Sequence, residues 1–241
     1  MRGLVLFEGA SVLDGSPIVA IATLSSANKK TGDMVQTWIM RSDCNPVEAS
    51  KANLDSSICG SCPHRQNKGG ACYVNLGQAP LSVYKSYKKG LYAKLSPNNM
   101  HKLQGRKVRL GSYGDPAAIP VSVWDAVNAL ADNVTGYTHQ LGHKNFDARI
   151  LDYCMASADT ARQAEKYNAM GIRTFRVKSE NSPIGDNEIE CLSDSQNLTC
   201  EQCMLCNGLK NKNNPSVVIN VHGTRKNKYE NKFGKIVVKQ K

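Results

Sequence analysis

The sequence predicts an α/β fold: a partial, barrel-like parallel sheet with an N-terminal β-hairpin and a cysteine-rich metal or cluster segment near the C-terminus. Three observations support this prediction. The chain has 241 residues, enough for one large domain. Its second half alternates short apolar runs with amphipathic segments, a pattern typical of strand–helix–strand units. Its first 57 residues are instead rich in strand-forming runs.

The N-terminal β-rich segment, residues 1–57, contains two runs typical of strands. PIVAIATL at 17–24 is continuously apolar, and QTWIMRS at 36–42 is β-branched and aromatic. The polar turn SSANKKTGD separates them, which predicts a hairpin. Residues 58–222 are expected to form a barrel-like domain that holds both cysteine groups, and residues 223–241 a basic C-terminal tail.

The remaining elements follow from spacing and from helix-terminating residues. Helical spacing with a basic face predicts a helix over 80–95. A second helix over 160–171 has Thr160 or Asp159 as its N-cap and Gly171 as its C-terminal stop. The other predicted elements are a strand at 107–114, a helix at 121–133, and strands at 134–140, 153–159, 172–179 and 216–223.

The chain is strongly basic, with 31 Lys and Arg against 20 Asp and Glu and a net charge of +11. Seven of the basic residues lie in the last 19 positions, against one acid. Such an excess favours a polyanionic partner, so we expect nucleic acid to bind through the helix 80–95 and the tail 223–241. A tail that only increases solubility is the alternative.

Cysteine usage and hydropathy bear on the cellular compartment. No apolar window reaches the length of about 18 residues needed to cross a membrane, and Glu8 and Asp14 interrupt the N-terminus too early for a secretory segment. We therefore expect a cytoplasmic protein, without a membrane partner, whose thiols stay reduced. Nine cysteines in that compartment predict metal or cluster ligands more than disulfides.

The C-terminal cysteine set comprises Cys191, Cys200, Cys203 and Cys206. Its C-x2-C-x2-C run can wrap three thiolates around one centre, and Cys191 supplies a fourth ligand. Zinc and a 4Fe–4S cluster both fit this set, because spacing alone does not separate them.

The N-terminal cysteine set comprises Cys59, Cys62 and Cys72. Three cysteines are what a cluster with one open iron needs, because that iron must bind a substrate or cofactor. The alternative is a closed structural zinc site that His64 or Cys44 completes. The long separation of the two sets along the chain predicts two separate centres.

Polar side chains at the ends of the predicted strands indicate a functional rim, because α/β folds place their sites beyond the C-terminal ends of parallel strands. Asp115 and His139 are expected to be functional rather than structural, whereas Asp159 is interpreted as an N-cap. The residues expected to be catalytic are Tyr113, Asp115, His139, Gln140 and His222, and those expected to bind a cofactor are Gly114, Asp115 and Ser157.

The combination of motifs resembles a group of uncharacterised phage and prophage proteins over residues 15–222. This resemblance implies a phage origin and hence the cytoplasm of a bacterial host, but no established activity. The motifs that carry it are ICGSCPHR, ACYVNLGQAPLSV, VRLGSYGDPAAIP, TGYTHQ, CMASADT, GIRTFRV and TCEQCMLCNG.

The layout is also similar to that of radical S-adenosylmethionine enzymes, which place three cluster cysteines in a loop after the first strand of a partial barrel. This resemblance implies that Cys72-Tyr73 is the last cluster position, that Gly114-Asp115-Pro116 contacts the amino group of S-adenosylmethionine, and that the C-terminal set holds an auxiliary cluster. The usual spacing in that family is C-x3-C-x2-C, whereas this chain has C-x2-C-x9-C.

Two hypotheses of different classes follow from these features. The leading one is a phage-type iron–sulfur enzyme, similar to radical S-adenosylmethionine enzymes, that acts on nucleic acid or nucleotides. The alternative is a non-catalytic, zinc-stabilised nucleic-acid-binding protein in which both cysteine sets are structural.

Overall fold

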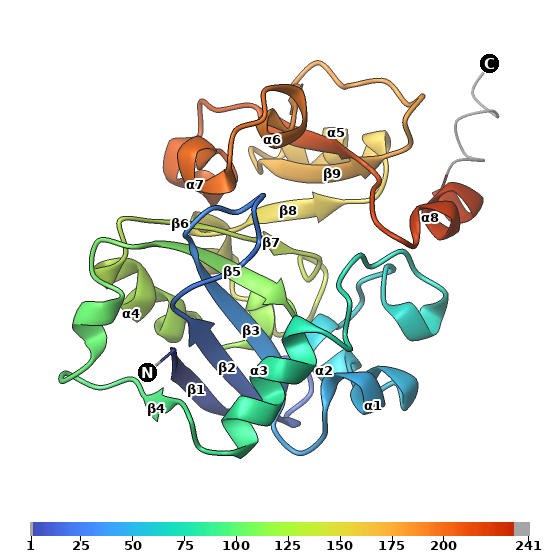
Figure 1. The fold of residues 1–241 in the computed structure, drawn as a ribbon. Helices are drawn as coiled ribbons and strands as arrows, with labels where there is room; N and C mark the ends of the chain where they lie inside the picture. Colours follow the sequence, from blue (N-terminus) through green and yellow to red (C-terminus); the bar gives the residue numbers. More distant parts are fainter. Residues whose placement is uncertain (1, 234–241) are drawn as a thin grey trace.

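A computed structural model describes residues 2–233 and arranges them as a mixed α/β fold on two largely parallel sheets (Figure 1). The predicted fold class is confirmed. The first sheet has the order β4-β1-β2-β3-β5-β6 and the second the order β10-β11-β9-β8-β7. The strands of the first sheet are β1 (Gly3–Ala10), β2 (Pro17–Thr23), β3 (Val35–Arg41), β4 (Ala93–Lys94), β5 (Lys107–Tyr113) and β6 (Asn133–Thr135). Those of the second are β7 (Tyr137–Thr138), β8 (Met155–Ala158), β9 (Thr174–Lys178), β10 (Glu188–Glu190) and β11 (Ser216–Asn220).

The helices lie in the connections between strands, except α8, which follows the last strand. Their bounds are α1 (Pro46–Lys51), α2 (Ser56–Cys59), α3 (Ala79–Lys88), α4 (Val121–Leu130), α5 (Ala161–Ala169), α6 (Leu192–Ser195), α7 (Cys200–Cys203) and α8 (Lys226–Phe233). No helix in this described part of the chain is both long enough and apolar enough to cross a membrane.

The predicted hairpin of residues 17–24 and 36–42 is confirmed as the antiparallel pair β2–β3. The run Ile18–Ala22 of β2 is fully buried, because this central strand has apolar neighbours on both faces. β1 adds a further antiparallel strand, and β3 pairs in parallel with β5. The N-terminal segment therefore lies in the same sheet as the strands that follow residue 58.

The predicted strand over 134–140 is divided in the structure, because the chain changes sheets at Gly136. β6 pairs with β5, whereas β7 pairs with β8. Between them, the carbonyl of Gly136 accepts a hydrogen bond from the Met155 amide at 2.9 Å. The parallel strands thus follow one another in the order β3, β5, β6, β7, β8, β9, β11 and β10, which gives the fold its barrel-like course.

The predicted helix over 80–95 is shorter than expected, since α3 ends at Lys88. Gly90 then adopts a left-handed φ of 67°, a conformation that terminates helices. Residues 93–94 form β4 on the edge of the first sheet, where they pair with β1. By contrast, the N-cap of α5 is confirmed, because the Thr160 hydroxyl accepts a hydrogen bond from the Gln163 amide at 3.1 Å.

Part of the predicted basic tail is helical and packed. α8 lies beside the loop that follows α2 (Figure 1), where Lys232 Nζ donates a hydrogen bond to the Pro63 carbonyl at 3.1 Å. Tyr229 of α8 is only 3% exposed, and its hydroxyl donates to the carbonyl of Val177 in β9. Residues 234–241 of the predicted tail lie outside the described residues.

The crossing at Gly136 predicts a stability effect. In Gly136→Ala the new Cβ would lie 2.6 Å from Cys154 Sγ and 3.1 Å from Leu110 Cβ. We expect this overpacking to lower the free energy of unfolding by about 1–3 kcal/mol, measured by urea denaturation. Gly142→Ala is the matched control, because nothing lies within 4 Å of its new Cβ. Equal free energies of unfolding for the two variants would contradict the tight crossing.

Candidate functional site

One cavity of about 270 Å³ lies among the parallel strands and the loops that follow them. It brings together the segments after β5, β7, β8 and β11 with the two cysteine-bearing segments. All seven cysteines of the two sets line it: Cys59, Cys62, Cys72, Cys191, Cys200, Cys203 and Cys206. The cavity is also lined by six of the other predicted site residues: Tyr113, Gly114, Asp115, His139, Ser157 and His222.

Within this cavity the two cysteine sets form separate electrostatic groups. Burial, followed by the charges of Cys62 and Cys72, raises the pKa of the Cys59 thiol well above its usual value. Burial also raises the pKa of Cys206 to about 12, and the cysteines that add to this effect are Cys191, Cys200 and Cys203. Thiols in such surroundings ionise only when a bound cation compensates their charge.

Among the described residues, no three cysteine sulfurs lie within 4.8 Å of one another. Zn–S bonds of about 2.3 Å bring the sulfurs of a tetrahedral site within about 3.8 Å of one another. In residues 2–233, the potential metal ligands whose atoms all lie within 4.8 Å of one another are two histidines and an aspartate, and no cysteine belongs to this group. A 4Fe–4S cluster separates its cysteines further, because each sulfur binds a different iron.

The loop of the N-terminal set is fixed by Gln140, which is fully buried behind the cavity. Its Nε2 donates hydrogen bonds to the Cys59 carbonyl at 3.0 Å and to Asp115 Oδ2 at 3.1 Å, and its Oε1 accepts from the Ser61 amide at 3.2 Å. Gly60 has a φ of 49°, and a Cβ there would collide with the Gln140 amide. The loop Cys59–Cys62 therefore packs against the Gln140 side chain, and this close approach requires a glycine at position 60.

Asp115 lines the cavity, and its carboxylate is hydrogen-bonded within the protein. Its carboxylate accepts hydrogen bonds from the Ala117 amide at 3.0 Å, the His139 amide at 2.8 Å and the Gln140 side chain at 3.1 Å. The residue is 6% exposed. Both oxygens therefore already accept hydrogen bonds from the protein, which favours a positioning role, and the catalytic and cofactor-binding roles expected from the sequence stay predictions.

Tyr113 differs from Asp115, because its polar group has no hydrogen-bond partner among residues 2–233. It is 5% exposed, and within the described residues its buried hydroxyl has no hydrogen-bond partner. Burial, followed by the charge of Cys59, raises its pKa well above the usual value. Tyr113 lines the cavity, so its unpartnered hydroxyl is a polar group for which a bound molecule could supply the missing partner after a small side-chain movement.

The C-terminal set is held by the loop between β2 and β3. Thr199 and Gln202 form a capping box at the start of α7, and the Cys200 amide donates a hydrogen bond to the Lys30 carbonyl at 2.9 Å. Arg109 faces the same part of the cavity, with its guanidinium carbon 5.6 Å from the centre of the Tyr137 ring. This arrangement supplies a fixed positive charge near the cysteines.

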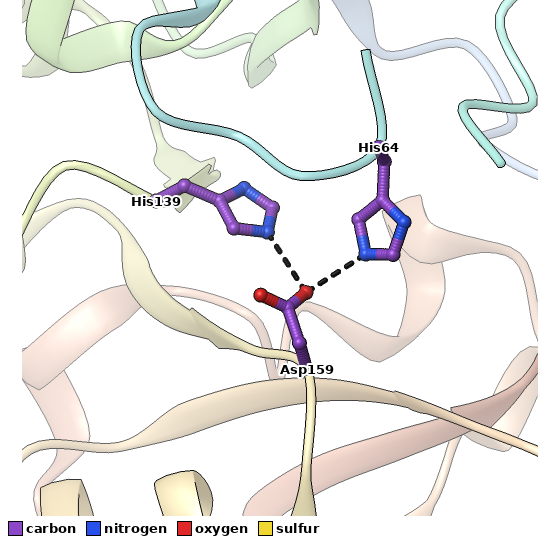
Figure 2. Close-up of side chains that lie close together, drawn as sticks. All are labelled: His64, His139 and Asp159. Carbon is purple, nitrogen blue, oxygen red and sulfur yellow. Dashed lines mark hydrogen bonds and ion pairs between the residues drawn. The ribbon is translucent and has the colours of Figure 1, made fainter. Parts of the chain in front are cut away.

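His64, His139 and Asp159 form a compact group at the edge of the cavity (Figure 2). Asp159 Oδ1 lies 2.8 Å from His64 Nε2 and 3.3 Å from His139 Nε2. Burial opposes ionisation of Asp159, but hydrogen bonds from the two histidines outweigh it and hold its pKa well below the usual value.

This group was only partly visible in the sequence. The sequence favours Asp159 as an N-cap, but Thr160 caps α5 and Asp159 faces the histidines. The sequence also offers His64 as a zinc ligand of the N-terminal set, whereas in the structure its Nε2 contacts Asp159. The position of Asp159 directly after a buried strand was the available signal. Cys44, the other candidate to complete that set, is not among the lining residues.

Comparisons of the chain with protein-family models, with curated proteins and with solved structures gave no significant match. The resemblances to phage proteins and to radical S-adenosylmethionine enzymes therefore remain predictions.

The assignment of Asp115 makes a testable prediction. Asp115→Asn places an amide group against donors that need an acceptor, so we expect the free energy of unfolding to fall by about 1–3 kcal/mol in chemical denaturation. Asp132→Asn, at an exposed position, is the matched control and should change stability by less than about 0.5 kcal/mol. If Asp115→Asn is as mild as this control, the carboxylate is free to serve a ligand.

Proposed function

We propose that the protein is an iron–sulfur enzyme, similar to radical S-adenosylmethionine enzymes, that acts on nucleic acid or nucleotides. The observation that carries this proposal is that both cysteine sets line one cavity among parallel strands. Purely structural metal sites need closed coordination and no shared cavity. Cysteines that surround a common space favour chemistry within that space.

The N-terminal set would hold a cluster through Cys59, Cys62 and Cys72, which leaves one iron without a cysteine ligand. Tyr113 lines the cavity, and its buried hydroxyl, which has no partner within the described residues, is the polar group that best fits an additional bound group. The C-terminal set would hold the second centre. When bound, an iron–sulfur cluster supplies one-electron transfer, which together with S-adenosylmethionine gives radical chemistry.

The order of elements supports the resemblance in layout. β3 is the first of the consecutive parallel strands, and the N-terminal set follows it before β5 begins. Gly114 and Asp115 come directly after β5, the position of the loop that would face S-adenosylmethionine. The Asp115 carboxylate accepts hydrogen bonds from within the protein. The backbone N–H and C=O groups of this loop would therefore make the contacts with the cofactor.

The protein's own residues prepare the cavity in three ways. Gln140 and Asp115 fix the cysteine loop against the end of β7. The inner faces of β9 and β11 supply apolar walls, including Val177 and Ile219, that exclude water. Arg109 lies near the C-terminal set, where its positive charge would stabilise an anionic cluster.

A nucleic-acid substrate is supported by charge and by the cavity lining. The net charge of +11 favours a polyanion. Tyr73 lines the cavity with 51% of its surface exposed, and its ring centre lies 5.3 Å from that of His222. Exposed aromatic rings of this kind stack on unpaired bases.

Anaerobic purification tests the proposal. We expect a brown protein that contains iron and acid-labile sulfide, since thiolate-to-iron charge transfer absorbs visible light. Cys200→Ser combined with Cys203→Ser should remove the iron of one centre only, because the two sets form separate groups. Loss of all iron from a folded variant would indicate a single shared centre. A colourless protein with zinc in both sets would favour the non-catalytic alternative.

The cofactor is tested by equilibrium dialysis with S-adenosylmethionine. Binding should be retained in the Cys200→Ser, Cys203→Ser variant and lost in Cys62→Ser, because the open iron belongs to the N-terminal set. Binding that survives Cys62→Ser with its iron lost would place S-adenosylmethionine elsewhere.

Salt dependence tests the nucleic-acid partner. Truncation after Phe233 removes Lys235, Lys239 and Lys241 and leaves α8 in place. The logarithm of the affinity should fall with the logarithm of salt concentration, and each lost phosphate contact should reduce that slope by about 0.7–0.9. Binding to single-stranded DNA and to RNA at several salt concentrations provides the measurement. An unchanged slope would exclude these lysines from the interface.

A further inference from the structure

His64, His139 and Asp159 come from three distant segments and meet at one point (Figure 2). Their ligand atoms all lie within 4.8 Å of one another. Metal–ligand bonds of about 2.0–2.2 Å place neighbouring ligand atoms about 3.0–3.4 Å apart. The two Nε2–Oδ1 separations, 2.8 and 3.3 Å, are close to this spacing.

We propose that these three residues bind a single divalent transition-metal ion, distinct from the centres of the two cysteine sets. Two imidazoles and one carboxylate are donors suited to Zn²⁺ or Fe²⁺. Cys62 lies beside His139, but no cysteine sulfur lies within 4.8 Å of all three ligand atoms, so the two histidines and the aspartate form a ligand set of their own. One bound cation would replace the two hydrogen bonds that Asp159 now accepts.

The three ligands are held in place before any metal binds. Asp159 follows β8 directly, His139 follows β7, and His64 lies in the loop of the N-terminal set. Such fixed backbones lower the cost of assembling a coordination site. The anchoring hydrogen bonds are His139 N to Asp115 Oδ2 at 2.8 Å, Cys72 N to His64 O at 2.9 Å, and Asp159 N to Gln163 Oε1 at 2.9 Å.

The surroundings leave the metal accessible from one side. The ring of His64 has Tyr229 and Phe233 of α8 as neighbours, with ring centres 5.8 and 5.5 Å away. The side chains of His64, Asp159 and His139 are 12%, 13% and 20% exposed, and all three line the cavity. Coordination positions not filled by the protein would therefore face the cavity and bind water or an oxygen atom of the substrate.

Zinc binding tests the site in the full-length, anaerobically purified protein. After equilibrium dialysis against Zn²⁺, the wild-type chain should bind one more equivalent of zinc than Asp159→Asn or His64→Gln, whose affinity at this site should fall at least about 100-fold. His143→Gln, which alters a histidine outside the cavity lining, is the matched control and should bind as the wild type does. Equal zinc binding by Asp159→Asn and the wild type would overturn the proposal.

A second measurement applies if either variant fails to fold. X-ray absorption at the zinc edge of the zinc-loaded wild-type protein should show nitrogen and oxygen atoms in the first coordination shell. A shell of sulfur alone would assign all the zinc to the cysteines and overturn the site. The zinc measurement and the proposed function can fail separately. Failure of the proposed function would appear as the absence of an iron–sulfur absorption spectrum, whatever the number of zinc ions bound.

Discussion

The buried carboxylate of Asp115 is the constraint on which the candidate site depends. It joins the loop after β5 to the end of β7 and, through Gln140, to the cysteine loop that begins at Cys59. These segments are distant in sequence, and each has little regular structure of its own. A charged acceptor with three donors in a buried setting is stronger than neutral hydrogen bonds would be. The geometry of the N-terminal set thus follows from an interaction behind the cavity.

Charge balance is the second constraint. Seven cysteines around one cavity can all be thiols, but any ionised form requires cations in the same space. The chain supplies Arg109 near the C-terminal set, whereas the N-terminal set has His139 beside Cys62. Burial alone acts to lower the pKa of His139, but the neighbouring charges of Cys62 and Asp159 outweigh it and raise that pKa well above its usual value. Each cysteine set therefore has a basic side chain beside it, which favours negative charge on its sulfur atoms.

The sequence predicted those features that depend on local pattern. The apolar bodies of the strands and the polar residues at their ends placed Tyr113 and His139 at the cavity, because strand periodicity and chain direction are visible in one dimension. The change of sheet at Gly136 was not predictable, since no local signal distinguishes a continuous strand from one that changes partner. The pairing of His64 with Asp159 was hidden for the same reason: it joins residues 95 positions apart.

The position of α8 has a consequence for the order in which the protein matures. The N-terminal set is synthesised early, but the C-terminal set and the helix that packs on His64 leave the ribosome only with the last part of the chain. At about 5–20 residues per second, the interval between Cys72 and Phe233 is roughly ten to thirty seconds. During that time the early cysteines have neither their second sheet nor their aromatic cover. A nascent chain thus exposes thiols that the finished protein encloses, and loading of the proposed centres would be a step that follows synthesis.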